Sequence, residues 1–285
     1  YVNYTNGTAV SGSNVSARNV FGNLAFSNLT DVNGRIARQI VREYKQTDGG
    51  APIRYSNYTF NASNPSGGLN GSQSWNMSTN RFLTFTLDTG CRDITNNNEV
   101  VNLAGNVSSA GTCFTVRANN VTINCNGYMV NYSTDGGSGE YGVYSAGANG
   151  TTIKNCRIVE GKAGSMNYAS YFFEANNGSI YNNSITTFGG DSYDVYVHLS
   201  SGIRIDSNNI SFYGGYGAGL YFEESHKNNI LSNRISVFDG YEGVVFSGSN
   251  NNYFYNNLIE TFLQADGLGI TLSFNNSIYN NSINV

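Results

Sequence analysis

The sequence predicts an all-β protein dominated by a parallel β-helix, a solenoid whose coils each add one short strand to several sheets. Three observations support this prediction: a repeat of about 24 residues, apolar alternation within each repeat, and an unusual composition. The 285 residues include 45 Asn and 34 Gly but only two Pro, together with 21 Tyr and 16 Phe. Asn and Gly tolerate the left-handed backbone of tight turns, whereas so many aromatic residues exclude a flexible linker.

The repeat is marked by an apolar anchor residue, followed five residues later by an aliphatic residue. The number of residues between successive anchors decreases slightly along the chain and settles at about 24. An earlier anchor, Ile123, lies upstream of Ile153 at a slightly longer spacing. Short alternating strands between an Asn turn and a Gly-rich turn form one coil of a β-solenoid. Leucine-rich repeats share the period, but their leucine–asparagine spacing is absent. The anchors are Ile153, Ile180, Ile205, Ile230, Phe254 and Ile278.

An Asn recurs three residues after most anchors. Equivalent residues of neighbouring coils are about 4.8 Å apart, the strand spacing, so stacked amides can hydrogen-bond along the solenoid axis. We therefore expect a structural ladder at these positions: Asn126, Cys156, Asn183, Asn208, Asn233, Asn257 and Asn281.

This pattern resembles the right-handed parallel β-helix repeat proteins, the pectate-lyase-like and NosD-type families. The resemblance rests on the phrases CNGYMV and TTIKNC and on serial YNNSI units, and it covers about residues 91–285. This combination is similar to versions found in archaeal surface proteins. The resemblance implies a right-handed solenoid but specifies no activity, because these families include lyases, hydrolases, epimerases, phage spikes and purely structural proteins.

Residues 1–90 do not repeat and are expected to form a separate region. The segment DVNGRIARQIVREYKQTDGG places apolar residues at helical spacing ahead of two glycines, which predicts one helix near residues 32–46. A solenoid end exposes strand edges and apolar core, so one interpretation of this region is a cap. The alternative is a β-rich assembly module, because RYSNYTF and RFLTFTL alternate like strands.

The four cysteines are spaced by about one coil: 22 residues from Cys91 to Cys113, and 31 from Cys125 to Cys156. Residues one coil apart have Cα atoms about 5 Å apart, inside the disulfide range, so the spacing predicts the bridges Cys91–Cys113 and Cys125–Cys156. No CxxC motif or His partner supports a metal or redox site. Two bridges imply an oxidising compartment or a hyperthermophile, whereas the alternative is four buried free thiols.

Asn-x-Ser/Thr sequons indicate an N-glycosylated, extracellular protein. Residues 1–90 hold eight sequons, where their 13 Asn and 19 Ser/Thr predict about three by chance. In the repeats, Asn turns followed by Ser create sequons partly by coincidence. The predicted glycosylation sites are Asn3, Asn6, Asn14, Asn28, Asn57, Asn61, Asn70, Asn76, Asn106, Asn120, Asn131, Asn149, Asn177 and Asn209.

The sequence favours a protein that is not an enzyme and that binds no metal or cofactor. The Gly-His-Gly, Arg-x-Lys and Asp-Pro-His motifs of β-helix enzymes that act on carbohydrates are absent. The best candidate acid/base pair is His198 with Glu223, which lies one repeat further along the chain and hence one coil away, near Asp194 or Glu224. A surface pair or a structural histidine is the preferred interpretation.

A tyrosine recurs nine residues before four of the anchors. The residues on both sides of it are expected to point inward, so strand alternation turns the tyrosines outward. Such a ladder predicts either a platform that binds sugar rings or proteins, or local stacking that shields the sheet. The residues are Tyr144, Tyr171, Tyr196 and Tyr221.

The last coil predicts self-assembly. Ile283 is the fifth residue after its anchor and the sequence stops at Val285, so we expect either an uncapped edge that another molecule covers or a fragment of a longer chain. A contact between this coil and residues 1–90 of another copy joins unlike surfaces and propagates into a filament. The expected assembly residues are Leu268, Ile270, Ile278 and Ile283.

Together these features predict a secreted, glycosylated structural protein of the cell surface that forms a head-to-tail filament or sheath. The alternative is a carbohydrate-binding or carbohydrate-cleaving protein that uses the tyrosine ladder. The expected partners are the protein itself, its covalent N-glycans and, under the alternative, a polysaccharide. A net charge of −4 without a basic run argues against nucleic acid, and no apolar stretch is long enough to predict a membrane span.

Overall fold

The computed structural model describes residues 1–4, 9–63, 71–87, 90–103, 105–263 and 265–285. The chain divides into two compact units, Tyr1–Gly90 and Cys91–Val285. Every regular element in the described residues is a β-strand. These residues include no helix that is long and apolar enough to cross a membrane.

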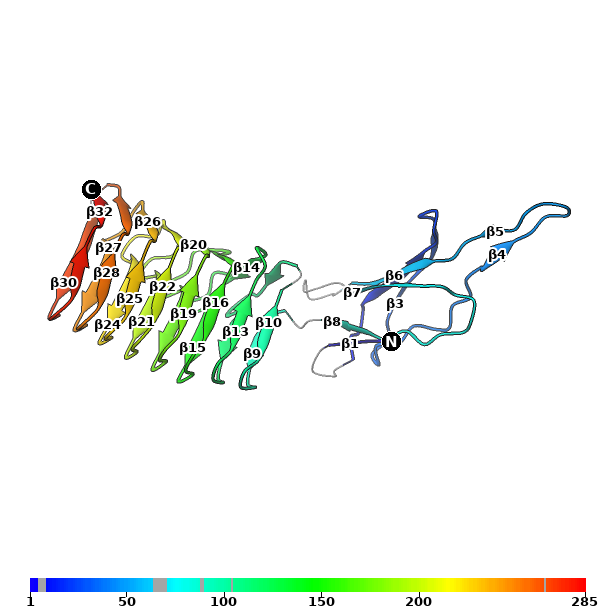
Figure 1. The fold of residues 1–285 in the computed structure, drawn as a ribbon, viewed down its shortest axis with the longest axis horizontal. Helices are drawn as coiled ribbons and strands as arrows, with labels where there is room; N and C mark the ends of the chain where they lie inside the picture. Colours follow the sequence, from blue (N-terminus) through cyan, green and yellow to red (C-terminus); the bar gives the residue numbers. More distant parts are fainter. Residues whose placement is uncertain (5–8, 64–70, 88–89, 104, 264) are drawn as a thin grey trace. The chain divides into compact units, whose positions relative to one another are not determined.

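Residues Cys91–Val285 form a parallel β-solenoid of eight coils (Figure 1). Each coil adds one strand to each of three eight-stranded sheets, and every strand pairs in parallel with the equivalent strand one coil away. Sheet 1 contains β9 (Arg92–Ile94), β12 (Phe114–Val116), β15 (Tyr141–Ala146), β18 (Tyr168–Phe173), β21 (Tyr193–His198), β24 (Ala218–Glu223), β27 (Glu242–Ser247) and β30 (Asp266–Thr271).

The other two sheets of the solenoid are built from shorter strands. Sheet 2 contains β10 (Val100–Asn102), β13 (Thr122–Asn124), β16 (Thr152–Lys154), β19 (Ser179–Tyr181), β22 (Arg204–Asp206), β25 (Asn229–Leu231), β28 (Tyr253–Tyr255) and β31 (Ser277–Tyr279). Sheet 3 contains β11 (Val107–Ser108), β14 (Met129–Tyr132), β17 (Arg157–Glu160), β20 (Ser184–Thr187), β23 (Asn209–Phe212), β26 (Arg234–Val237), β29 (Leu258–Thr261) and β32 (Ser282–Asn284).

The predicted repeat register is confirmed. Ile153, Ile180 and Ile205 pair with one another across sheet 2 and are fully buried. Phe222 and Phe246 stack inside the solenoid with ring centroids 4.9 Å apart. Burying each such side chain contributes roughly 1.5–3 kcal/mol, so one continuous apolar column stabilises the coils.

The predicted asparagine ladder is present from Asn183 onward. Asn183 donates its backbone N–H to Oδ1 of Asn208 at 3.0 Å, and Asn208 donates its own to Asn233 at 3.0 Å. The ladder continues through Asn257 to Asn281. These residues therefore satisfy buried backbone donors at each turn.

The start of that ladder differs from the prediction. Asn126 is exposed and donates its side-chain amide to the Leu103 carbonyl at 2.8 Å. Cys156 donates its backbone N–H to Oδ1 of Asn183 at 2.9 Å, so the ladder ends at this cysteine. A disulfide replaces the amide stack in this part of the solenoid.

Both predicted disulfides are confirmed. Cys91 and Cys113 are joined with Cα atoms 4.3 Å apart, and Cys125 and Cys156 with Cα atoms 4.7 Å apart. These distances are close to the strand spacing, because each bridge links residues on adjacent coils. The bridges therefore fasten the first coils of the solenoid to one another.

Residues Tyr1–Gly90 form a smaller β-unit with its own apolar core. Its antiparallel sheet has the order β3–β2–β6–β7, accompanied by a parallel pair, β1 with β8, and a hairpin, β4 with β5. The strands are β1 (Val2–Tyr4), β2 (Asn14–Arg18), β3 (Leu24–Leu29), β4 (Tyr44–Lys45), β5 (Ile53–Arg54), β6 (Tyr58–Ala62), β7 (Gly71–Trp75) and β8 (Phe85–Leu87).

The helix predicted near residues 32–46 is wrong. The Asp31 carboxylate accepts the backbone N–H groups of Asn33 at 2.8 Å and Arg35 at 2.9 Å. Asp31 also donates its backbone N–H to the Arg35 carbonyl at 2.8 Å, which closes a tight turn in place of a helical turn. Ile40 is 90% exposed, so the apolar residues at helical spacing have no common buried face that would stabilise a helix.

Candidate interaction surfaces

Sheet 1 carries the tyrosines that the repeat predicted, in register on β15, β18, β21 and β24. A second tyrosine column lies three residues earlier on β15, β18 and β21. Sequence reasoning missed this column, although the phrases YGVY, YASY and YDVY contain it. We call the two columns together the tyrosine face: Tyr141, Tyr144, Tyr168, Tyr171, Tyr193, Tyr196 and Tyr221.

The rings of the tyrosine face stack on one another along the solenoid axis. The centroids of Tyr171 and Tyr196 are 4.7 Å apart with planes 5° apart, and those of Tyr193 and Tyr221 are 4.6 Å and 10° apart. Tyr196 is only 9% exposed, so the expected exposed platform is wrong for this residue. A flat ligand needs an uncovered ring face, and here neighbouring rings cover these faces.

Of the candidate acid/base residues, His198 and Glu223 come together, in register on β21 and β24. Glu223 accepts the hydroxyl of Tyr196, and its Oε2 lies 3.8 Å from Nε2 of His198. Burial, with the added effect of the Glu223 carboxylate, raises the pKa of Tyr196, which keeps this hydroxyl a donor. Glu224 lies on an exposed turn and Asp194 points into the core. The contacts of His198 and Glu223 are those of a packed polar pair.

Two carboxyl groups are buried inside the solenoid. Glu160 accepts four N–H groups, among them those of Asn167 at 2.8 Å and Gly189 at 2.8 Å. Asp194 accepts the Thr187 hydroxyl at 2.9 Å, while its Oδ2 has no hydrogen-bond partner among the described residues. Burial raises the pKa of Asp194 well above its usual value, which favours the neutral form of this buried acid.

An exposed aromatic column runs along the turns that follow sheet 3. Phe188, Tyr213, Phe238 and Phe262 each come directly after a strand of this sheet. Their successive ring centroids are 5.6, 4.3 and 4.9 Å apart. Phe188, Tyr213 and Phe262 remain 42–46% exposed. The sequence signal for this column is an aromatic residue ahead of each turn, as in FGG, YGG and FDG.

Carboxylates accompany this aromatic column. Asp191 and Asp239 lie in the same turns, and Glu242 and Asp266 begin β27 and β30, where they are neighbours in register. None of the four forms an ion pair within the described part of the chain. Burial and the charge of Asp266 raise the pKa of Glu242. We call this surface the acidic aromatic strip: Phe188, Asp191, Tyr213, Phe238, Asp239, Glu242, Phe262 and Asp266.

The N-terminal unit contains a groove of about 830 Å³. Three arginines, Arg35, Arg38 and Arg81, line it together with apolar residues, and none of them pairs with a described carboxylate. The guanidinium carbon of Arg81 lies 4.5 Å from the ring centroid of Trp75. We call this surface the arginine groove; its apolar lining includes Val15, Ile36, Phe60, Met77, Phe82, Leu83 and Phe85.

The two units have opposite net charges. Residues 1–90 carry seven Lys or Arg and four Asp or Glu, a formal net charge of +3, whereas residues 91–285 carry eight and fifteen, a net charge of −7. The overall value of −4 conceals this difference. Counting charge separately in the repeating and non-repeating regions would have revealed it from the sequence.

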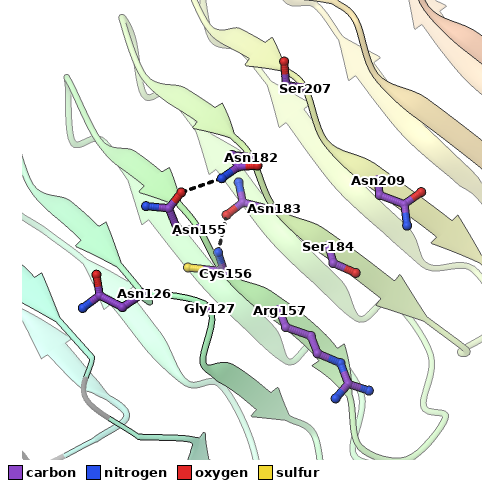
Figure 2. A pocket seen from close by; sticks show the side chains of 10 residues that line it. All are labelled: Asn126, Gly127, Asn155, Cys156, Arg157, Asn182, Asn183, Ser184, Ser207 and Asn209. Carbon is purple, nitrogen blue, oxygen red and sulfur yellow. Dashed lines mark hydrogen bonds between the residues drawn. The ribbon is translucent and has the colours of Figure 1, made fainter.

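An open groove of about 660 Å³ lies across the turns between sheets 2 and 3. Figure 2 shows the residues that line it. Amide and hydroxyl side chains dominate it, and Asn182 donates to Oδ1 of Asn155 at 2.7 Å. Such groups pair well with the hydroxyls of a carbohydrate. We call this surface the amide groove: Asn126, Gly127, Asn155, Cys156, Arg157, Asn182, Asn183, Ser184, Ser207 and Asn209.

None of the described sequon asparagines among the predicted glycosylation sites is buried. Nine are exposed: Asn14, Asn28, Asn57, Asn76, Asn106, Asn120, Asn149, Asn177 and Asn209. Asn3, Asn61 and Asn131 are half-buried. Asn6 and Asn70 lie outside the described residues.

The four expected assembly residues lie on the last coil. Leu268 packs against the solenoid core and is half-buried, whereas Ile270, Ile278 and Ile283 are 46%, 38% and 42% exposed. Their register partners one coil earlier, Phe246, Phe254 and Ile259, are at most 1% exposed.

The fold defines a parallel β-solenoid protein, and its two disulfides are typical of an oxidising compartment. The sequence model of the NosD family, described as periplasmic copper-binding protein, matches residues 70–265, more than half of the chain. The chain therefore belongs to the NosD family. No curated protein matches the sequence. The family and the disulfides are consistent with a secreted protein.

The described residues do not fit a copper site. Copper binds imidazole, thiolate and thioether groups, but all four thiols are joined in disulfides. Nδ1 of His226 accepts the backbone N–H of Asn250 at 3.0 Å, and His198 stacks on Tyr196. Among the described residues, no three His, Cys, Asp or Glu side chains come together where a metal ion could bind.

Proposed function

We propose that the protein is a structural protein of the extracellular or periplasmic space whose chains associate with one another into a filament or sheath. The observation that carries this proposal is the separation of charge, +3 on residues 1–90 against −7 on residues 91–285. Opposite charges favour contact between unlike units of different copies and disfavour contact between like units. Contacts between unlike surfaces propagate unless the rotation closes a ring.

We also propose that the surface is N-glycosylated. The exposed sequon asparagines on both units support this, because their side chains are accessible to an attached glycan. Only 12% of the residues are charged, so glycans would supply much of the hydration of the surface. The intact mass of the protein from its native source should exceed that of the bare polypeptide by several glycans. A mass without glycans would contradict this part of the proposal.

The absence of an enzymatic activity is part of the same proposal. Its support is that the Glu223 carboxylate is engaged by both Tyr196 and His198, and that Asp194 is buried in the core. Incubation with polysaccharides tests this directly. New reducing ends or unsaturated products would contradict it.

The assembly is tested by sedimentation velocity and electron microscopy of the intact protein over a range of concentrations. We expect oligomers that lengthen with concentration and shorten at high salt, because salt screens the attraction between opposite charges. A monomer that persists at high concentration and low salt would contradict the proposed assembly.

Carbohydrate binding is a second candidate function, and the amide groove favours it over the tyrosine face. Seven of its ten lining residues are Asn or Ser, whose side chains are neutral hydrogen-bonding groups. Oligosaccharide titrations should be run before and after enzymatic deglycosylation, because a glycan on Asn209 would cover this groove. We expect Asn155→Ala to weaken binding and Tyr144→Phe to leave it unchanged. The opposite result would indicate that the carbohydrate binds to the tyrosine face.

A further inference from the structure

We infer that the arginine groove of one copy binds the acidic aromatic strip of a second copy. This inference rests on the proposed function, since it names the two surfaces through which the chains associate. The groove belongs to the N-terminal unit and the strip to the solenoid, so the contact joins unlike units.

The arginine groove has the chemistry of a receptor for an acidic and aromatic surface. Its three guanidinium groups lack carboxylate partners among the described residues, and its remaining lining is largely apolar. Guanidinium groups bind carboxylates through paired hydrogen bonds and also stack on aromatic rings. The contact of Arg81 with Trp75 shows this second mode within the unit itself.

The acidic aromatic strip has the complementary chemistry. Phe188, Tyr213 and Phe262 are 42–46% exposed, and exposed apolar area of this kind favours contact with another surface. Glu242 and Asp266 are register neighbours, and their like charges repel. A guanidinium placed beside them would reduce this repulsion, while the rings of Phe188 or Phe262 would enter an apolar groove.

The other aromatic surface is a poorer match for the groove. The rings of the tyrosine face are half-buried against one another, and Glu223 is engaged by Tyr196 and His198. The strip instead combines exposed rings with four carboxylates that have no ion pair among the described residues. A second copy of this chain therefore supplies the charge and the apolar area that the groove lacks.

The test reverses charge on each surface of the full chain in turn. The groove variant is Arg38→Glu with Arg81→Glu, and the strip variant is Asp239→Arg with Asp266→Arg. Sedimentation velocity at low salt should show self-association weakened about 30-fold or more in each, the loss typical of a central charged contact. A 1:1 mixture should restore association, because the strip variant keeps a basic groove and the groove variant keeps an acidic strip.

The matched control is Arg204→Glu with Lys227→Glu, which makes the same change in charge as the groove variant on exposed residues of the solenoid outside the strip and the amide groove. It should associate like the unaltered protein. Circular dichroism and melting of every variant confirm that each one folds.

Three results would overturn the inference. If both variants assemble like the unaltered protein, the contact is wrong although assembly stands. If the mixture fails to restore association, the two surfaces are not partners. If the unaltered protein is monomeric at every concentration, the inference and the proposed assembly fail together.

Discussion

The solenoid and the N-terminal unit reach an all-β fold by different routes. In the solenoid every strand pairs with the strand one coil away, so one residue position becomes a column through the whole unit. In Tyr1–Gly90 the main sheet is antiparallel, its order β3–β2–β6–β7 skips along the chain, and no column forms. A sequence repeat therefore gives columns of equivalent residues in the solenoid, and the non-repeating N-terminal unit has no such columns.

Because of this difference, the two units are stabilised by different kinds of contact. The solenoid depends on contacts between neighbouring coils: apolar columns, amide ladders and two disulfides. The N-terminal unit depends on a small core around Val15, Tyr58, Phe60 and Phe85 and on specific turns. Substitutions in columns should spread along the solenoid, and those in the N-terminal unit should stay local.

The largest expected effect comes from removing the bridge between Cys125 and Cys156. Replacing both cysteines with alanine should lower the free energy of unfolding by about 3.5 kcal/mol, because the bridge closes a 31-residue loop in the unfolded chain. Urea unfolding measures this loss. Hydrogen exchange should show it in coils of the solenoid, and equal loosening of Tyr1–Gly90 would contradict the independence of the two units.

The next effect compares a buried ladder position with an exposed one. Asn208→Ala should cost about 2–3 kcal/mol, because Asn208 accepts from Asn183 and donates to Asn233 and to the Ile180 carbonyl. Ser184→Ala, an exposed change on the adjacent strand β20, should cost under about 0.5 kcal/mol. Equal losses in thermal unfolding would show that the ladder is not a special source of stability.

The sequence predicted the solenoid because periodicity reports register directly. The anchors at Ile153 and Ile180, the bridge Cys125–Cys156 and the ladder through Asn208 all follow from counting residues between coils. Exposure was harder to predict, because alternation gives the side of the strand but not what covers it. Tyr196 faces outward and is nevertheless buried by neighbouring rings.

The N-terminal unit was less predictable because local hydrogen bonds override periodicity there. The prediction of a helix there failed because it did not take into account the Asx turn at Asp31. The arginine groove was also missed, because Arg35 and Arg81 are far apart in the sequence. No repeat relates these positions, so only the folded chain brings them to one groove.

An effect of a different kind, which depends on pH, tests the column that holds Asp194. Its pKa is raised by burial, so the folded state keeps a proton that the unfolded state loses above about pH 4. This group therefore removes stability as pH rises, at up to about 1.4 kcal/mol per pH unit until its folded pKa is reached. Asp194→Asn keeps an acceptor for Thr187 and should abolish this loss, making the variant the more stable protein at pH 7.

Urea unfolding at pH 4 and pH 7 measures that difference. Asp191→Asn, an exposed change three residues earlier, is the control and should leave the pH dependence unaltered. If Asp194→Asn and the unaltered protein show parallel pH profiles, the side chain is ionised in the fold. The hydrogen bond between Thr187 and Asp194 would then involve a buried carboxylate, and the prediction would be wrong.

The smallest effect tests the N-terminal unit, where helical periodicity failed. Ile40 is 90% exposed, whereas its neighbour Val41 packs against the core of the unit. Ile40→Glu should change the free energy of unfolding by less than about 0.5 kcal/mol, and Val41→Glu should cost about 1–3 kcal/mol because it buries a charged group. On a helix the two residues would share one apolar face, so both changes would be costly. Equal losses of unfolding free energy in the two variants, measured by urea unfolding, would therefore support a helix in this segment. A loss for Val41→Glu alone would support the non-helical chain that follows the turn at Asp31.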